Sequence, residues 1–186
     1  MLRIKKNIAI VCLACMLLLA TAAGAATQGT VNISFDLERI GAIASNQYAV
    51  WIEDNNGKYI RTLSATRFAA TGGLAKRPAT LPTWAKASDW TNNPKDVDAV
   101  STATPGSGSL TVVWDCKDDS GQAVPAGTYV YKVEGNNFWE NGFIWSGTIV
   151  VGQGAASSAA TVQYLPDQAK ATEKGMLVTN VKASYK

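Results

Sequence analysis

Alternating apolar and polar residues recur in short segments along this chain, and this pattern predicts β-strands. The first such segment runs from Val31 to Leu37. A turn is expected from Asp54 to Lys58, where Asn56-Gly57 supplies the positive φ of a hairpin. The other segments predicted as strands are 48–53, 59–63, 110–114, 128–134, 143–151, 161–164 and 176–185. Short strands separated by regular turns predict an all-β fold, an Ig-like β-sandwich.

One stretch, about 65–108, lacks this alternation and is predicted to be a long loop inserted into the sandwich. It contains four of the six prolines, and Leu81 to Ser88 is expected to form a short helix with Pro82 in its first turn. Long loops in compact domains are usually functional or disordered, and the two tryptophans Trp84 and Trp90 favour a packed, functional loop. A second stretch, 152–160, is rich in small residues and is expected to be flexible.

The amino terminus has the pattern of a secretory signal peptide. Basic residues lie before an uncharged apolar run over 8–23, and a small-residue stretch, Ala23-Gly24-Ala25-Ala26, follows. The run is short for a membrane-spanning helix, and no charged stop-transfer segment follows it. We therefore predict a signal peptide over 1–25 and a single β-sandwich domain over 26–186. The mature protein is expected to be periplasmic or extracellular, with no stable membrane anchor.

Removal of the signal peptide changes the charge and cysteine content. The whole chain has 17 Lys and Arg against 14 Asp and Glu, and Arg3, Lys5 and Lys6 would leave with the signal. The mature chain then has no formal net charge, so nucleic acid is not an expected partner. Cys116 is the one cysteine that stays, and we expect it to be a buried, small apolar residue.

The chain contains no histidine, which limits its possible chemistry. Catalytic triads based on histidine and His-ligated metal sites are excluded. Asp115, Asp118 and Asp119 miss the spacing of a calcium loop and are predicted to form a turn, so we expect no metal site. Glu134 and Glu140 have the chemistry of an acid–base pair, but nothing places them across a cleft. We therefore predict that the protein is not an enzyme.

Four aromatic residues in the carboxy-terminal half have two possible roles. They suit the lining of a sugar or peptide groove, and they equally suit packing within the sandwich, which is the more common role of such residues. These residues are Tyr131, Phe138, Trp139 and Trp145.

The segment from Trp114 to Tyr129 resembles the signature W-D-G-K-D-D-x-G-x-x-V-P-x-G-x-Y of the Ig-like module in flagellar hook-capping proteins and other bacterial surface sandwiches. In that signature the aspartates and glycine close a turn, and the tyrosine anchors the next strand in the core. Cys116 replaces the glycine here, so the resemblance implies a strained turn. The signature implies a fold and carries little information on function.

Several blocks resemble a family of predicted periplasmic proteins, the domain of unknown function 2271. The blocks occur in the same order and with similar spacing, and they are 49–63, 76–78, 81–84 and 98–104. The last block in that family usually reads D-x-x-T-G-A-T, which resembles the target motif of FAD:protein FMN transferase. This enzyme links FMN through a phosphodiester to the hydroxyl of the final threonine.

The resemblance implies FMN attached to Thr104, with Asp98 as part of the recognised motif. The flavin would carry the redox chemistry, and Trp84 or Trp90 would stack on its ring. Thr102 stands where the motif has glycine, which puts modification in doubt if the transferase needs a backbone shape that favours glycine. The same residues also fit a plain surface loop, and we place that interpretation first.

Three functions follow from the sequence. The first is an exported, non-catalytic module that binds or supports a protein partner and holds no cofactor. The alternative is an electron-transfer protein flavinylated on Thr104, which would have the FMN transferase as a partner. The third, a scaffold resembling hook-capping proteins, depends on the fold signature alone.

Overall fold

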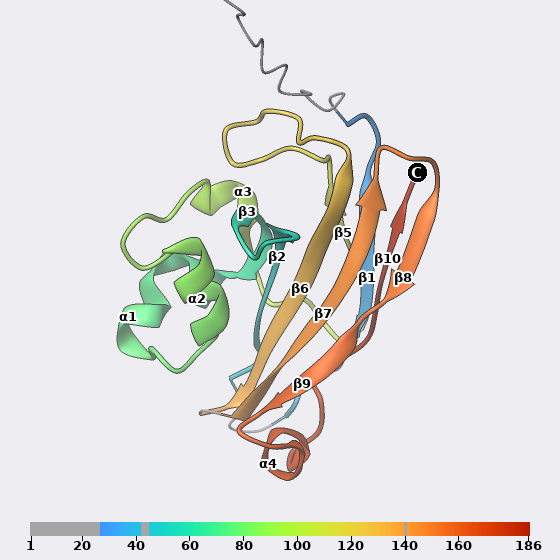
Figure 1. Cartoon of the computed structure of the whole chain (residues 1–186). Coiled ribbons are helices and arrows are strands. Elements are labelled where there is room, and N and C mark those ends of the chain that lie inside the picture. Colours follow the sequence, from blue (N-terminus) through green and yellow to red (C-terminus); the bar gives the residue numbers. More distant parts are fainter. Residues whose placement is uncertain (1–26, 42–44, 140) are drawn as a thin grey trace, which may run out of the picture.

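The computed structural model confirms an all-β sandwich of two packed sheets, and it describes residues 27–41, 45–139 and 141–186 (Figure 1). The predicted signal peptide lies outside these residues. One sheet has four strands in the order β5-β1-β10-β8, and the other has six in the order β4-β3-β2-β6-β7-β9. The strands of the two sheets are β1 (Val31–Leu37), β2 (Gln47–Asp54), β3 (Tyr59–Thr66), β4 (Ser101–Thr102), β5 (Gly108–Trp114), β6 (Gly127–Phe138), β7 (Asn141–Val151), β8 (Ala156–Ala159), β9 (Thr161–Leu165) and β10 (Val178–Tyr185).

Alternation along β1 explains how the first strand forms and packs. Val31, Ile33, Phe35 and Leu37 are buried, and the polar residues between them lie on the other face. β1 occupies the middle of its sheet, antiparallel to both β5 and β10. The predicted hairpin turn between β2 and β3 is also present, with a positive φ at Gly57.

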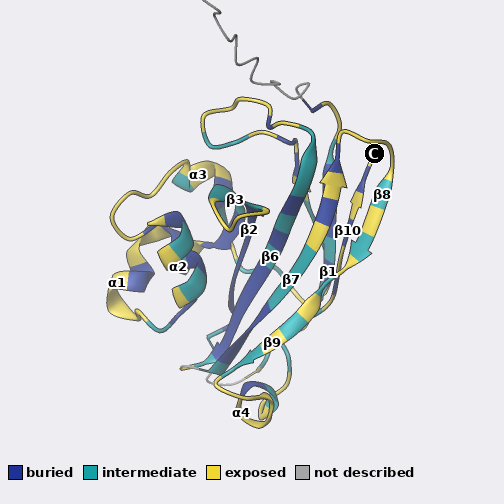
Figure 2. Cartoon of the chain, viewed as in Figure 1, coloured by how far each residue is buried: buried dark blue, intermediate teal, exposed yellow. Residues whose placement is uncertain are grey.

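The main hydrophobic core lies between the two sheets. Large side chains from both sheets meet there and exclude water, and burial of this kind is the dominant stabilising term in folding. Figure 2 shows the buried bands on β1, β2 and β6. The largest buried side chains of this core include Phe35, Tyr48, Trp114, Tyr131 and Phe143.

The stretch predicted as one long inserted loop, about 65–108, is an insertion between β3 and β5, and just under half of it is helical. It forms η1 (Ala69–Gly73), α1 (Leu74–Lys76), α2 (Pro82–Ser88) and α3 (Val97–Val100), and then the short strand β4. The predicted helix is confirmed as α2, with Pro82 at its start. We call residues 67–100 the helical insert. It packs on the six-stranded sheet through a second hydrophobic cluster that contains Trp51, Trp84 and Trp90 (Figure 1).

Residues 152–160 are also more ordered than the sequence suggested. β8 lies within this stretch and pairs with β10 in the four-stranded sheet. β9 follows after Ala160 and pairs with β7 in the six-stranded sheet. The chain therefore passes from one sheet to the other at Ala160, which joins the two sheets along one edge. A short helix, α4 (Gln168–Thr172), lies between β9 and β10.

The turn around Cys116 has the strained backbone that was predicted. Cys116 has φ +54° and is fully buried, which also confirms its predicted role as a small apolar residue. The carboxylate of Asp118 closes the turn by accepting the backbone N–H groups of Ser120 and Gln122. The Tyr129 hydroxyl donates to the carbonyl of Pro125 at 2.8 Å, which anchors the start of β6.

Candidate functional site

The predicted attachment segment lies on the surface between α3 and β5. Asp98 is exposed on α3, and Thr104 is half-buried in the irregular stretch after β4. β4 runs parallel to β3 and pairs Thr102 with Thr66. The Thr102 hydroxyl lies 3.5 Å from the hydroxyl of Tyr48, which fixes the segment against β2.

Thr102 has an ordinary backbone conformation in this structure. It lies in a strand, and it is not among the residues with positive φ. The backbone conformation at this position therefore does not require glycine. The replacement of the motif's glycine by threonine is compatible with the fold.

The two tryptophans expected to stack on a flavin are not available for it, so that part of the prediction was wrong. Both side chains are buried in the helical insert, with ring centroids 4.9 Å apart. The Trp84 indole N–H donates to the Thr62 hydroxyl at 2.9 Å, and that of Trp90 donates to the Ala70 carbonyl at 3.0 Å. These tryptophans hold the insert on the sheet, because burial of a large ring with a satisfied N–H is stabilising.

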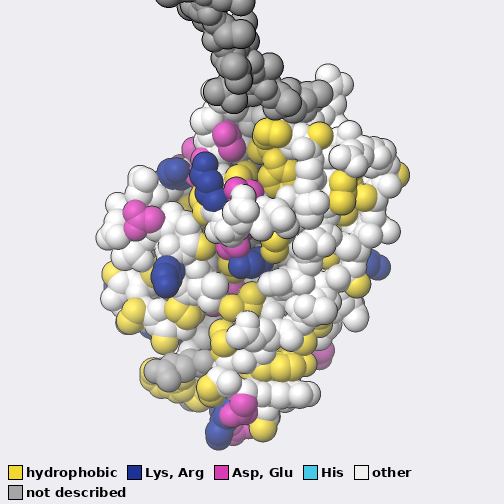
Figure 3. Space-filling model, in the orientation of Figure 1, with side chains coloured by type: hydrophobic (Ala, Val, Ile, Leu, Met, Phe, Trp, Pro, Cys, Tyr) yellow, Lys and Arg dark blue, Asp and Glu magenta, His cyan; other side chains and the backbone are white. Residues whose placement is uncertain are grey.

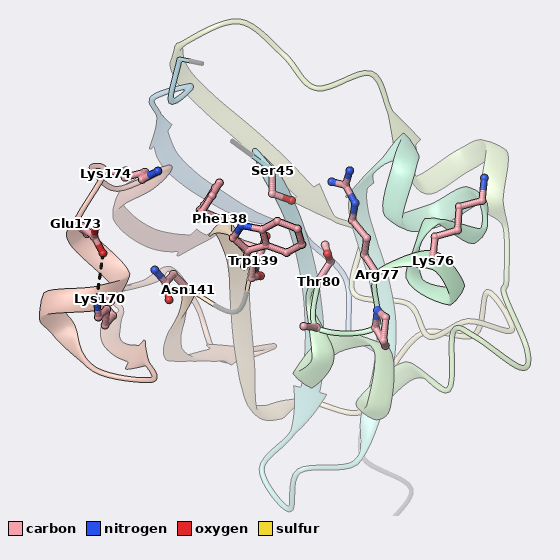
Figure 4. A pocket seen from close by; sticks show the side chains of 13 residues that line it. Ser45, Lys76, Arg77, Thr80, Phe138, Trp139, Asn141, Lys170, Glu173 and Lys174 are labelled. Atoms are coloured by element: carbon pink, nitrogen blue, oxygen red, sulfur yellow. Dashed lines mark hydrogen bonds and ion pairs between the residues drawn. The ribbon is translucent and has the colours of Figure 1, made fainter. Parts of the chain in front are cut away.

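A different part of the molecule forms a surface groove of about 860 Å³. Figure 4 shows it between two walls, the loop after α1 in the helical insert and the helix α4 with the residues after it. The floor comes from Ser45, two residues before β2, and from the end of β6, Trp139 and the start of β7. We call it the basic groove, and its lining includes Ser45, Lys76, Arg77, Thr80, Asn136, Phe138, Trp139, Asn141, Lys170, Glu173 and Lys174.

The walls of the basic groove are mostly positively charged. Lys76 and Arg77 lie on one wall, while Lys170 and Lys174 lie on the other with Glu173, the one acidic residue among the lining residues that the structure describes (Figure 4). Glu173 pairs with Lys170 at 3.5 Å. The groove therefore gathers positive charge. By contrast, basic and acidic side chains are interspersed on the face shown in Figure 3.

Aromatic rings orient the two cations that lie nearest the floor. The Arg77 guanidinium carbon lies 5.2 Å from the ring centroid of Phe68, and the Lys174 ammonium lies 3.9 Å from that of Phe138. Both distances are within the range of cation–π attraction. These contacts leave the N–H groups of both side chains able to donate to a ligand.

The floor of the groove combines an exposed ring with buried polar atoms. Trp139 is 73% exposed, and it lies between Arg77 and Lys174 in Figure 4. The Asn136 amide N–H donates to the Trp139 carbonyl at 2.6 Å, which holds the turn. Within the described part of the chain, the Asn136 Oδ1 and Ser45 Oγ atoms are buried without a hydrogen-bond partner.

The four aromatic residues singled out in the sequence divide between the two predicted roles. Phe138 and Trp139 line the groove. Tyr131 is buried in the core, with its hydroxyl donating to the Ser158 carbonyl, and the Trp145 indole donates to the Val178 carbonyl. The basic residues of the groove were missed, because 76–77 and 170–174 are far apart in the sequence and share no motif.

The aspartates after β5 act in a turn, as predicted. Asp115 pairs with Arg61 at 3.2 Å, and Asp119 pairs with Lys95 of the helical insert at 3.1 Å. No group of three or more potential metal ligands occurs among residues 27–41, 45–139 and 141–186. Within the same ranges, no helix has the length and apolar character needed to cross a membrane.

Glu134 is buried beneath the helical insert rather than in a cleft. Its carboxylate accepts the backbone N–H groups of Thr83 at 3.2 Å and of Trp84 at 2.7 Å, at the start of α2. Burial raises the pKa of Glu134 above the ordinary carboxyl value, and the hydrogen bonds from α2 partly oppose that effect. Glu140, its suggested acid–base partner, lies outside the described residues.

The fold and the groove together define a two-sheet β-sandwich protein with a helical insert and a basic surface groove. Residues 29–162 match the family Predicted periplasmic protein (DUF2271), and the chain belongs to that family, as predicted. The family description supports the predicted export of the protein. No curated protein and no solved structure gives a match. The matched range includes the helical insert but ends before α4. One wall of the groove therefore lies within the range that matches the family, and the other wall lies outside it.

Proposed function

We propose that this chain is a non-catalytic periplasmic module that binds or supports a protein partner through the basic groove. The supporting observation is the exposed Trp139 between basic side chains on opposite walls. Trp and Arg are the residue types that contribute most to binding energy at protein interfaces. A ring that remains largely exposed in the folded chain gains apolar contact only when something covers it.

Site-specific photo-crosslinking in cells tests this proposal. A benzophenone amino acid replaces Trp139 in one variant and Val113 in the other, since Val113 is 54% exposed on β5 in the opposite sheet. We expect a discrete protein adduct at position 139 and none at position 113. The adduct should disappear when Arg77→Glu and Lys174→Glu are added. Equal adducts at both positions, or an adduct unaffected by the charge reversals, would contradict the proposal.

A second candidate function is that of a flavin carrier modified on Thr104. The exposed Asp98, the partly exposed Thr104 and the strand conformation of Thr102 favour it, since a transferase must reach the hydroxyl. In the attachment step the Thr104 oxygen would bond to the phosphorus of the FMN half of FAD, and AMP would leave. The bound flavin would supply the redox chemistry. The hook-capping hypothesis stays a prediction, since no observation favours it.

Intact mass tests the flavin candidate. We expect the mature protein, made in cells with an active FMN transferase, to gain the mass of one FMN phosphodiester. Thr104→Ala should abolish the gain, and Thr102→Gly, which restores the glycine of the motif, should keep or increase the modified fraction. An unmodified chain in cells that flavinylate a control substrate would exclude this candidate and leave the binding proposal untouched.

A further inference from the structure

The basic groove has features that define the chemistry of its occupant. Its positive charge comes from two separate elements, the loop after α1 and the region of α4. Among the lining residues that the structure describes, four are basic and one is acidic, so this lining has a positive excess even though the mature chain has none. Complementarity of charge across an interface favours an occupant with negative groups. Because the cations are on both walls, those groups must be distributed along the occupant rather than gathered at one point.

The floor of the groove contains polar atoms that an occupant could pair with by hydrogen bonds. Asn136 is a lining residue that is only 3% exposed, and its buried Oδ1 atom has no hydrogen-bond partner among the described residues. A buried acceptor without a donor destabilises the folded chain, and a ligand N–H that reached it would remove that cost. Ser45 Oγ, also without a partner among those residues, can donate to a ligand carbonyl. A peptide backbone presents an N–H and a C=O at each residue and satisfies both atoms together.

We propose that the occupant is an extended, acidic segment of a partner protein, with an apolar side chain placed over Trp139. This inference rests on the proposed function and specifies its partner. The Asn136 and Ser45 atoms would bond to the backbone of the segment, and its carboxylates would lie against Arg77 and Lys174. The groove volume of about 860 Å³ is within the range of established ligand sites, so a short segment can enter it.

Fluorescence anisotropy with labelled peptides tests this inference on the mature protein. The probe is a peptide of about a dozen residues, rich in Asp and Glu with a central Phe, long enough to extend beyond a groove of this size. Its matched control replaces every Asp and Glu with Asn and Gln. An oligomer of galacturonic acid serves as an acidic saccharide, because an exposed tryptophan and polar side chains also suit sugars.

Two double variants separate the groove from general electrostatics. Arg77→Glu with Lys174→Glu reverses one cation on each wall, and Lys58→Glu with Lys182→Glu makes the same change in net charge at exposed positions outside the groove. We expect the acidic peptide to bind, the groove variant to bind at least about tenfold more weakly, and the control variant to bind as the parent does. Trp139→Ala should also weaken binding.

Each of three results would overturn the inference. The acidic peptide could fail to bind, it could bind the groove variant as well as the parent, or the saccharide could bind more tightly than the peptide. If the peptide test gave one of these results but photo-crosslinking gave a protein adduct at position 139, the inference of an acidic segment would be rejected and the proposed function would be retained. Absence of both signals would reject the two proposals together.

Discussion

At the scale of single residues, Glu134 shows how a buried charge secures one element on another. It belongs to β6, in the middle of the six-stranded sheet, and it accepts two backbone N–H groups at the start of α2. These N–H groups have no partner within their own helix, so a carboxylate is well suited to them. The cost is desolvation, which raises the pKa of Glu134.

The raised pKa of Glu134 predicts a specific pH dependence of stability. The folded protein holds this proton more strongly than the unfolded chain does, so the stabilising contribution is complete below the unfolded pKa. It is lost as the pH rises through the folded pKa. Urea unfolding of the parent and of Glu134→Gln across this range measures the effect. We expect the parent to lose stability relative to the variant as pH rises, and a constant difference would contradict this assignment.

Cys116 combines two features that determine its reactivity. Its side chain is fully buried, and burial, with a smaller effect from the nearby Asp115 carboxylate, raises the pKa of the Cys116 thiol to about 11. Because the thiolate is the reactive form, we expect iodoacetamide to label the native protein very slowly at neutral pH. Labelling should become fast in urea, and mass spectrometry measures both rates. Rapid labelling of the native protein would show that the thiol is accessible.

At the scale of elements, β7 is shaped by a side chain of β6, its neighbour in the six-stranded sheet. Gly147 pairs directly with Tyr131 of β6, and the Tyr131 ring occupies the space where a side chain at 147 would lie. The Tyr131 hydroxyl then reaches Ser158 of β8 in the other sheet. The glycine therefore allows one side chain to connect both sheets.

Gly147→Ala should destabilise the protein by about 1–3 kcal/mol, because the added methyl group would overlap the Tyr131 ring and force it to move. Gly106→Ala is the matched control, since a methyl group there meets no atom within 4 Å. Chemical denaturation measures both variants. A loss of stability in Gly106→Ala equal to that in Gly147→Ala would show that the cost does not arise from Tyr131.

Elements differ in how well the sequence predicts them. β1 and the hairpin of β2 and β3 are evident from alternation and an Asn-Gly turn, because each pattern spans a whole element. The helices η1, α1 and α3 have three to five residues, too few for a helical period to emerge. Each of them places buried residues in the hydrophobic cluster that contains Trp51, so tertiary packing supports their helical form.

The candidate site was still less accessible to sequence analysis. The segment from Asp98 to Thr104 was identified because its residues are consecutive and resemble a motif. The basic groove brings together Ser45, Arg77, Trp139 and Lys174, which the chain separates widely. The aromatic residues Phe138 and Trp139 were singled out as possible groove-lining residues, and only the fold shows that Trp139 is exposed.

At the scale of the whole molecule, the two ends of the described chain lie together and far from the groove. Val31 at the start of β1 pairs with Tyr185 at the end of β10, whereas the groove lies by α4 at the opposite end of the sandwich (Figure 1). A partner in the groove therefore does not compete for space with either end.

The pairing of β1 with β10 also determines how the molecule responds to mechanical force. Handles at Thr30 and Lys186 would pull the pair apart from the Val31–Tyr185 end, so that its hydrogen bonds break one after another. Handles at Glu38 and Lys186 would load all the bonds at once, in shear. We expect single-molecule stretching to unfold the protein at a clearly lower force in the first geometry, and equal forces would contradict this. A tether through both ends would thus make this sandwich a weak mechanical link.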